Sequence, residues 1–390
     1  MKTNMPNKNT SELATIKLFA MGCHIQISLN TTRLNPRYSQ IVIDQQIALL
    51  TSDVQKRIAQ WEQIFSRFDE TSELMQLNNQ TNQWIKVSPE LFEVLQRAIH
   101  FTSKTQGLVT PTLLKELWSA GYQHSFETLP KMSEPCVTII GSKASSSKIS
   151  SNTSSNINLN ASTNLQDESI TNDFKLNHAN QQIEHIQLRQ LADGKHQVYL
   201  PAGMALDLNG YVKGWCAMQL AEHISHLHDW QLPCLVDMGG DIAIGVPRDQ
   251  IDNPITWGVA VAQPYFANGE QVQDNEDVAI LAISAGAVAT SGQDYRRWWH
   301  DGRWQHHLIH PHYSQPVTSD VLTATVLATD TMTAEVYAKY CVLLGVTKAM
   351  AWLNKHDIAA LLIDTNNKVL VTSAMYPNLV QANLITAIGV

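Results

Sequence analysis

The stretch Asp207-Leu-Asn-Gly-Tyr-Val-Lys-Gly-Trp215 joins an apolar run to an amphipathic segment that continues to Ile224. This pattern predicts a strand, a tight loop and then a helix. Gly210 and Gly214 allow the backbone to turn sharply and to approach a ligand. Because the first N–H groups of a helix are unpaired, the helix start can bind an anion, and Lys213 adds a positive charge. An ordinary helix start with a solvated lysine fits the same residues.

The segments before this stretch alternate between strand and helix patterns. Apolar positions predict two strands over residues 16–21 and 25–29, joined through Gly22. Helical spacing follows over residues 41–65. A further helix is predicted over residues 88–105, because serine is a good cap and Pro89 suits the first helical position.

Strand patterns dominate the segments after it. They fall on residues 234–244, where Gly239-Gly240 interrupts the run, and on residues 257–262, 280–283 and 321–327. A helix over residues 334–343 and a hairpin over residues 359–372 complete the chain. Strands and helices mixed in this order predict an α+β fold.

Size and composition exclude several classes of protein. With 390 residues and 44% hydrophobic residues the chain can bury a large core. The formal net charge is −8 and no basic block occurs, so nucleic acid is not an expected partner. The five cysteines are scattered, which argues against a disulfide framework and a thiolate zinc site.

The ends and the middle of the chain differ from the rest. Residues 1–14 are predicted to be a disordered lead-in, and residues 15–390 one domain with a disordered Ser/Asn-rich insertion at about 143–180. No apolar run approaches the roughly 20 residues that span a bilayer. No apolar signal region follows Met1, so a cytoplasmic location is expected.

Glycine turns and small polar residues indicate a phosphate-bearing ligand. The turns lie around Gly22, Gly210 and Gly239, and they accompany Lys213 and the cluster Thr290-Ser291-Gly292. Neither a Gly-x-x-x-x-Gly-Lys-Ser/Thr loop nor a Gly-x-Gly-x-x-Gly loop occurs, which argues against a nucleoside-triphosphatase or a Rossmann fold.

The segment His306-His-Leu-Ile-His-Pro-His312 holds the densest group of titratable side chains. Neutral imidazole is a common zinc ligand, but these spacings fit no helix face. A general base is another use for one of these histidines, and a solvated loop is a third.

Several short motifs follow one another in a fixed order over about residues 16–380. They are Met21-Gly-Cys23; Ser66, Phe68, Ser72, Leu74 and Asn78; residues 107–112; residues 207–214; Gly239-Gly240-Asp241; Thr290-Ser291-Gly292 with Tyr295-Arg296; and His307-Leu-Ile-His-Pro311. In this order they resemble the motifs of the FAD:protein FMN transferases, also called flavin transferases or ApbE-like proteins.

The resemblance implies a T-fold-like α+β domain that binds FAD and splits its diphosphate. FMN would be attached to a Thr or Ser of an acceptor protein, with release of AMP. The resemblance places His307 as the base, and a hydroxyl group does need such a base because it is a poor nucleophile. The implied flavin contacts are Met21, Phe68, Leu108, Val109, Thr110, Asp207, Lys213 and Ile309.

The resemblance also implies a magnesium site formed by Gly210, Glu335 and Lys339. The family's Ala-Asp-x-x-x-Thr turn here reads Ala334-Glu-Val-Tyr-Ala-Lys339, so an ammonium group stands where a metal ligand is expected. Glu335 and Lys339 are one helical turn apart and can pair, in which case FAD binding depends little on Mg²⁺. Alternatively, Lys339 points to solvent and Mg²⁺ binds through Glu335.

Three activities fit this altered sequence. The first is an active FAD:protein FMN transferase, for which the retained His307, Lys213 and Asp207 argue. The second is a catalytically decayed homologue that binds FAD or FMN. The third is an FAD pyrophosphatase, which differs only in the nucleophile that attacks the phosphate.

Overall fold

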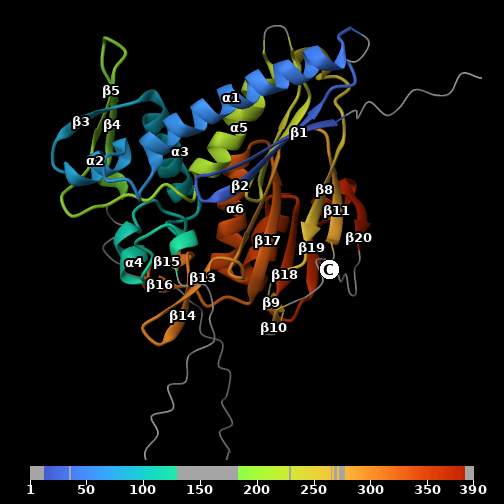
Figure 1. The fold of residues 1–390 in the computed structure, drawn as a ribbon. Coiled ribbons are helices and arrows are strands. Elements are labelled where there is room, and N and C mark those ends of the chain that lie inside the picture. The colour runs from blue at the N-terminus through green and yellow to red at the C-terminus, as the bar shows by residue number, and fades with distance from the viewer. Residues whose placement is uncertain are drawn as a thin grey trace, which may run out of the picture.

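An antiparallel eight-stranded sheet forms the centre of the computed structural model, which describes residues 13–34, 37–129, 183–227, 230–264, 266–267, 270–271 and 277–382. The strand order is β1-β2-β6-β7-β12-β17-β18-β19 (Figure 1). The strands are β1 Leu13–Ala20, β2 Cys23–Asn30, β6 Cys234–Met238, β7 Asp241–Gly245, β12 Ala287–Gly292, β17 Val321–Ala328, β18 Ala360–Asp364 and β19 Val369–Val371.

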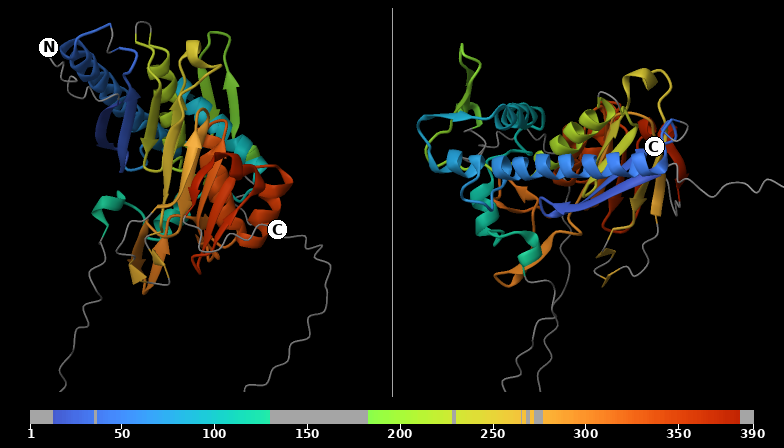
Figure 2. Two further views of the ribbon diagram at one scale, coloured as in Figure 1. Left: turned by 90° about the vertical axis from the view of Figure 1, so that its right-hand side faces the viewer. Right: turned by 45° about the horizontal axis from the view of Figure 1, so that its top comes forward.

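Helices cover one face of this sheet and form the larger core. Alternate residues of β2, including Ile25 and Ile27, are buried there because strand side chains alternate between the two faces. Trp215 packs edge-on against Phe65 at 5.5 Å between ring centroids. The helices are α1 Gln40–Phe65, α3 Pro89–Lys104, α5 Val212–Ser225, α6 Thr331–Leu344 and α7 Val346–Lys355; Figure 2 shows α1 lengthwise in its right-hand view.

A smaller sheet in the order β20-β11-β8 covers the opposite face. Its strands are β8 Trp257–Ala262, β11 Asp277–Ile283 and β20 Leu379–Ala382. Leu281 from this sheet and Leu235 and Ile363 from the central sheet belong to one buried cluster. The strands from β6 to β19 of the central sheet are therefore covered on both faces, whereas β1 and β2 keep exposed residues on one face. Burial of a defined set of side chains fixes the register of these strands.

Shorter elements surround these layers. The strands are β3 Trp84–Val87, β4 Gln187–Gln190, β5 His196–Tyr199, β9 Phe266–Ala267, β10 Glu270–Gln271, β13 Arg297–His300, β14 Arg303–His306, β15 Ile309–His310 and β16 Gln315–Pro316. The helices are α2 Glu73–Asn79 and α4 Leu114–Ser119, with 3-10 turns at Phe126–Thr128, Ile183–His185, Arg248–Gln250 and Ser373–Asn378.

Serine side chains cap the starts of α2 and α3. The Ser72 hydroxyl accepts a hydrogen bond from the Met75 N–H at 3.1 Å and caps α2. The Ser88 hydroxyl accepts from the Leu91 N–H in the same way, and Pro89 is the first residue of α3. Each cap pairs an N–H group that the helix leaves unbonded, so the helix begins at that residue.

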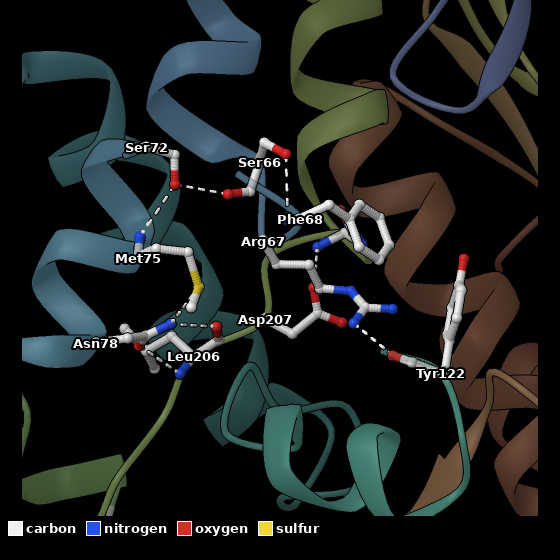
Figure 3. Close-up of polar contacts among 10 residues, drawn as sticks. Ser66, Arg67, Phe68, Ser72, Met75, Asn78, Tyr122, Leu206 and Asp207 are labelled. Atoms are coloured by element: carbon white, nitrogen blue, oxygen red, sulfur yellow. Dashed lines mark hydrogen bonds and ion pairs between the residues drawn. The ribbon is translucent and has the colours of Figure 1, made fainter. Parts of the chain in front are cut away.

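The predicted strand ahead of Gly210 is wrong. The Asn78 side chain accepts from the Leu206 N–H at 2.8 Å and donates to the Leu206 carbonyl at 3.0 Å, as Figure 3 shows. The Asp207 N–H donates to the Pro111 carbonyl at 2.8 Å. Because loop residues and one side chain pair these backbone groups, no neighbouring strand is needed.

Smaller differences concern element boundaries. The run over residues 234–244 is two strands joined by a turn, since Gly239 and Gly240 have φ values of +71° and +94°. Leu13 pairs with Asn30, so β1 begins inside the lead-in expected over residues 1–14.

Two expectations lie outside the described residues. They are the Ser/Asn-rich insertion at about 143–180 and the remainder of the lead-in, residues 1–12. The division of the chain into a lead-in, one domain and an insertion therefore stays a prediction. Among the described helices, none has both the length and the apolar character of a membrane span.

Candidate functional site

A cavity of about 820 Å³ lies where the turns of the central sheet meet α6 and the loops ahead of α4 and α5. The turn between β1 and β2 and the turn between β6 and β7 both contribute to its wall. Ten of the residues expected to form a site line this cavity: Leu108, Val109, Thr110, Asp207, Gly210, Lys213, His307, Ile309, Glu335 and Lys339.

Met21 and Phe68, the other two expected flavin contacts, lie in a small pocket beside the cavity. This pocket has a volume of about 30 Å³ and shares Lys213 and Arg296 with the main cavity. The Met21 N–H donates to a Glu62 carboxylate oxygen at 2.8 Å, which fixes the turn after β1. The structure thus brings all of the expected residues into one region, and their roles stay predictions.

Lys213 forms a buried ion pair with Asp241. The Lys213 ammonium lies 2.6 Å from a carboxylate oxygen of Asp241, which is 1% exposed. Burial alone would lower the pKa of Lys213, but the carboxylates of Asp241 and Glu335 outweigh burial and raise the pKa. Lys213 therefore keeps its charge at neutral pH and places a cation in the cavity wall.

The start of α5 is bound by an internal carboxylate. The Gly214 N–H donates to Glu335 Oε2 at 3.2 Å, so the anion next to this N–H group belongs to the chain itself. A Cβ atom at Gly214 would lie 2.8 Å from that oxygen and 3.1 Å from the Thr331 carbonyl oxygen. Gly214 thus permits the close approach of α5 and α6, and the sharp turn predicted for it is not its role.

Arg67 lies against Asp207, Phe68 and Tyr122 (Figure 3). Its fully buried guanidinium has Nε 3.7 Å from Asp207 Oδ1 and donates to the Tyr122 carbonyl at 2.8 Å. The guanidinium carbon also lies 4.2 Å from the ring centroids of Phe68 and Tyr122. These contacts hold Asp207 and Tyr122 in the cavity wall and Phe68 in the small pocket beside it.

His307 is a neutral imidazole in the cavity wall. Burial and the positive charges of Arg296, Lys339 and Lys213 hold its pKa well below the usual 6.5. Its Nδ1 atom is buried and has no hydrogen-bond partner among the residues that the structure describes. A neutral ring with a vacant hydrogen-bonding position can accept a proton from a ligand hydroxyl.

His306 faces the other side of the same segment. Its Nε2–H donates to the Val317 carbonyl at 2.8 Å, and its Nδ1 accepts from the Leu308 N–H at 3.3 Å. Burial lowers the pKa of His306 to about 4. Both ring nitrogens are bound to backbone groups, so His306 is a structural residue and cannot be the zinc ligand that the sequence left open.

His306 should make the fold sensitive to acid. The unfolded chain binds this proton near pH 6.5, whereas the folded chain binds it only near pH 4. Protonation of His306 should therefore lower the free energy of unfolding by about 3 kcal/mol as the pH drops from 6.5 to about 4. Denaturant unfolding of the parent and of His306→Gln would measure it. The variant should lose the share due to His306 and keep the share due to His307, whose pKa is also lowered. The exposed His124→Gln control should keep the whole pH dependence, and equal slopes in all three proteins would contradict the assignment.

The residues present do not fit a magnesium ion. One carboxylate oxygen of Glu335 lies 2.8 Å from the Lys339 ammonium, and the other accepts from the Gly214 N–H. In the described part of the chain, no three His, Cys, Asp or Glu side chains are arranged to hold a metal ion. Mg²⁺ requires near-octahedral oxygen coordination, and the one carboxylate expected to supply it is already paired.

Sequence reasoning gave no role to Arg67, Asp241 or Arg296. Asp241 and Arg296 belong to quoted motifs, but the partner of Asp241 lies 28 residues away, and Arg296 donates to the Gly22 carbonyl 274 residues away. Arg67 stands between two quoted motif positions, Ser66 and Phe68. Its immediate neighbours, one polar and one apolar, give no signal that it is buried.

The fold is α+β, and both Lys213 and His307 line its cavity. Residues 21–362 match the model of the ApbE family, and the chain belongs to this family. It is 25% identical to an FAD:protein FMN transferase of Treponema pallidum over 323 residues, which cover 80% of this chain and 76% of that protein. It is 22% identical to the Escherichia coli K12 enzyme of the same name over 326 residues, covering 81% and 77%.

Solved structures agree with the α+β fold. The ApbE protein from Thermotoga maritima superimposes with a TM-score of 0.67 at 18% identity, covering 95% of this chain and 100% of that one. The flavin transferase ApbE from Vibrio cholerae gives a TM-score of 0.62 at 21% identity, covering 94% and 99%. The fold expected from the sequence motifs is therefore confirmed.

Proposed function

We propose that this protein is an FAD:protein FMN transferase, which moves FMN from FAD to a Thr or Ser hydroxyl of an acceptor protein and releases AMP. The observation that carries the proposal is one cavity in which the neutral His307 and the charged Lys213 face the same space. A base and a fixed cation are the two groups that a hydroxyl attack on a diphosphate requires.

The flavin end of FAD would lie between the loop before α4 and the pocket of Met21 and Phe68. Leu108 and Val109 offer apolar surface there, and Asp207 is held in place by Arg67. The diphosphate would lie beside Lys213, whose ammonium can share its charge between Asp241 and a phosphate oxygen. FAD carries a flavin ring and a diphosphate, so one ligand uses both ends of the site.

The chemical step needs one proton acceptor. The acceptor hydroxyl oxygen attacks the phosphorus of the FMN half, and the bond from that phosphorus to the bridging oxygen breaks. AMP leaves with the bridging oxygen, while His307 takes the hydroxyl proton. Lys213 and Arg296 stabilise the charge that develops on the phosphate oxygens. The chain's own residues thus supply the base and the positive charge.

Replacing Lys213 with methionine should weaken FAD binding by about 10- to 100-fold, because a charge-assisted hydrogen bond to the diphosphate is lost. Titration of the purified variant with FAD, followed by flavin fluorescence, would measure the affinity. Lys213→Met with Asp241→Asn is the matched control, since it removes the carboxylate that would otherwise stay buried without its partner. Parent-like affinity in both variants would remove Lys213 from the site.

The products formed from FAD distinguish the proposed transferase from an FAD pyrophosphatase and from a protein that only binds FAD. The protein would be incubated with FAD and a flavin-accepting domain, and AMP, free FMN and acceptor-bound flavin would be quantified. AMP in equal amount to acceptor-bound FMN supports transfer. AMP with free FMN indicates a pyrophosphatase, and bound FAD without products indicates a binding protein.

A further inference from the structure

We propose that the Lys339 ammonium, held by Glu335, takes the place of a divalent cation, so that this chain binds the FAD diphosphate without Mg²⁺. The inference rests on the proposed function, because it concerns the diphosphate of the same ligand. It identifies the cation of the site as a side chain of the protein.

The Glu335 carboxylate is fully committed within the protein. It is 0% exposed, with Oε1 2.8 Å from the Lys339 ammonium and Oε2 accepting from the Gly214 N–H at 3.2 Å. Burial raises the pKa of Glu335, while the neighbouring Lys339 and Lys213 ammonium groups favour its charged form. A metal ion at Oε1 would compete with the Lys339 ammonium for the same oxygen, and one at Oε2 would lie next to that ammonium and be repelled by it.

Lys339 also occupies the space beside Gly210. A Cβ atom built on Gly210 would lie 3.4 Å from Lys339 Cε and 4.0 Å from the ammonium nitrogen. The lysine side chain is 12% exposed and lines the cavity instead of extending into solvent. Gly210 and Glu335 are the positions to which the sequence assigned Mg²⁺, and the ammonium group stands next to both.

Two cations of the cavity wall are held in place by buried carboxylates. Lys213 is paired with Asp241, and Lys339 is paired with Glu335. The wall also holds Arg296, Asp294 and Asp207, and Asp207 is paired with Arg67. These pairs hold the ammonium groups in place before the ligand arrives. A cation fixed in advance stabilises phosphate charge without the reorganisation that solvent would require.

If Lys339 is the cation beside the diphosphate, FAD affinity should not depend on Mg²⁺; if Mg²⁺ is that cation, affinity should rise when it is added. The parent would be titrated with FAD by flavin fluorescence, once with EDTA and once with MgCl₂ added. The two dissociation constants should agree within about twofold. Parent affinity that is about tenfold or more higher with Mg²⁺ would overturn the proposal. This comparison needs no variant, so its outcome does not depend on whether a variant folds.

A double variant gives the converse test. In Lys339→Thr with Glu335→Asp, FAD binding in EDTA should weaken by about tenfold or more and recover when Mg²⁺ is added. Lys355→Thr, which removes an exposed lysine of α7, is the matched control and should bind as the parent does. A double variant that folds and binds FAD like the parent in EDTA would also overturn the proposal.

The same titration distinguishes this inference from the proposed function. Absence of FAD binding in both media would refute the proposed function, and the inference with it. Binding that depends on Mg²⁺ would refute the inference alone, since FAD would still occupy the site.

Discussion

Replacing His307 with alanine is expected to reduce FMN transfer by about two to four orders of magnitude, while FAD affinity changes little. The reason is that His307 is the neutral imidazole in the cavity wall, and its Nδ1 atom has no partner among the described residues. Without it, the acceptor hydroxyl must lose its proton to water. Transfer would be measured as acceptor-bound flavin over time, and affinity by titration with FAD.

His306→Gln is the matched control for this prediction. Glutamine can still donate to the Val317 carbonyl, and His306 is not among the residues that line the cavity. Its transfer rate should stay within a few-fold of the parent, as expected for a residue that contacts no substrate. A His307→Ala protein with near-normal transfer, or equal losses in both variants, would contradict the assignment of the base.

Replacing Arg67 with methionine should lower the free energy of unfolding by about 3 to 5 kcal/mol, because it leaves the charge of Asp207 in the cavity wall without its cation. The Arg67 side chain is 0% exposed and that of Asp207 is 13% exposed, so water can compensate only in part. The stacking on Phe68 and Tyr122 is lost as well. Denaturant unfolding of both proteins would measure the difference.

A double variant separates the ion pair from the stacking. Arg67→Met with Asp207→Asn removes both charges, so it should be less destabilised than the sum of the two single variants. The difference gives the coupling energy of the pair. Additive effects would show that the stacking and the Tyr122 hydrogen bond account for the role of Arg67, and that Asp207 does not depend on it.

The sequence predicted the elements whose signals are local. Ser88 and Pro89 mark the start of α3 because a cap needs only its own next three residues. The strands β1 and β2 follow from the alternation of buried and exposed residues. The strand predicted before Gly210 does not form. The Asn78 side chain, 128 residues away, hydrogen-bonds the backbone of Leu206, and no periodicity in the sequence reveals such a contact.

In the functional site, too, the sequence predicted which residues take part but not the contacts between distant residues. The family motifs identified Lys213 and His307 by position, and the structure brings both to one cavity. The charge states of Lys213 and His307 could not be predicted from the sequence. Lys213 is paired with Asp241, and the pKa of His307 is lowered by burial and by three cations from separate parts of the chain. Pairing of Glu335 with Lys339 was predictable, because one turn of helix separates them.

The mass of an acceptor domain after incubation with FAD tests the central claim most directly. The account predicts that the purified protein increases this mass by one FMN less one water, that AMP appears in equal amount, and that the gain is lost when the accepting Thr or Ser is replaced by Ala. The His307→Ala protein should give almost no gain in the same time. An unchanged acceptor mass while the parent protein binds FAD would contradict the account.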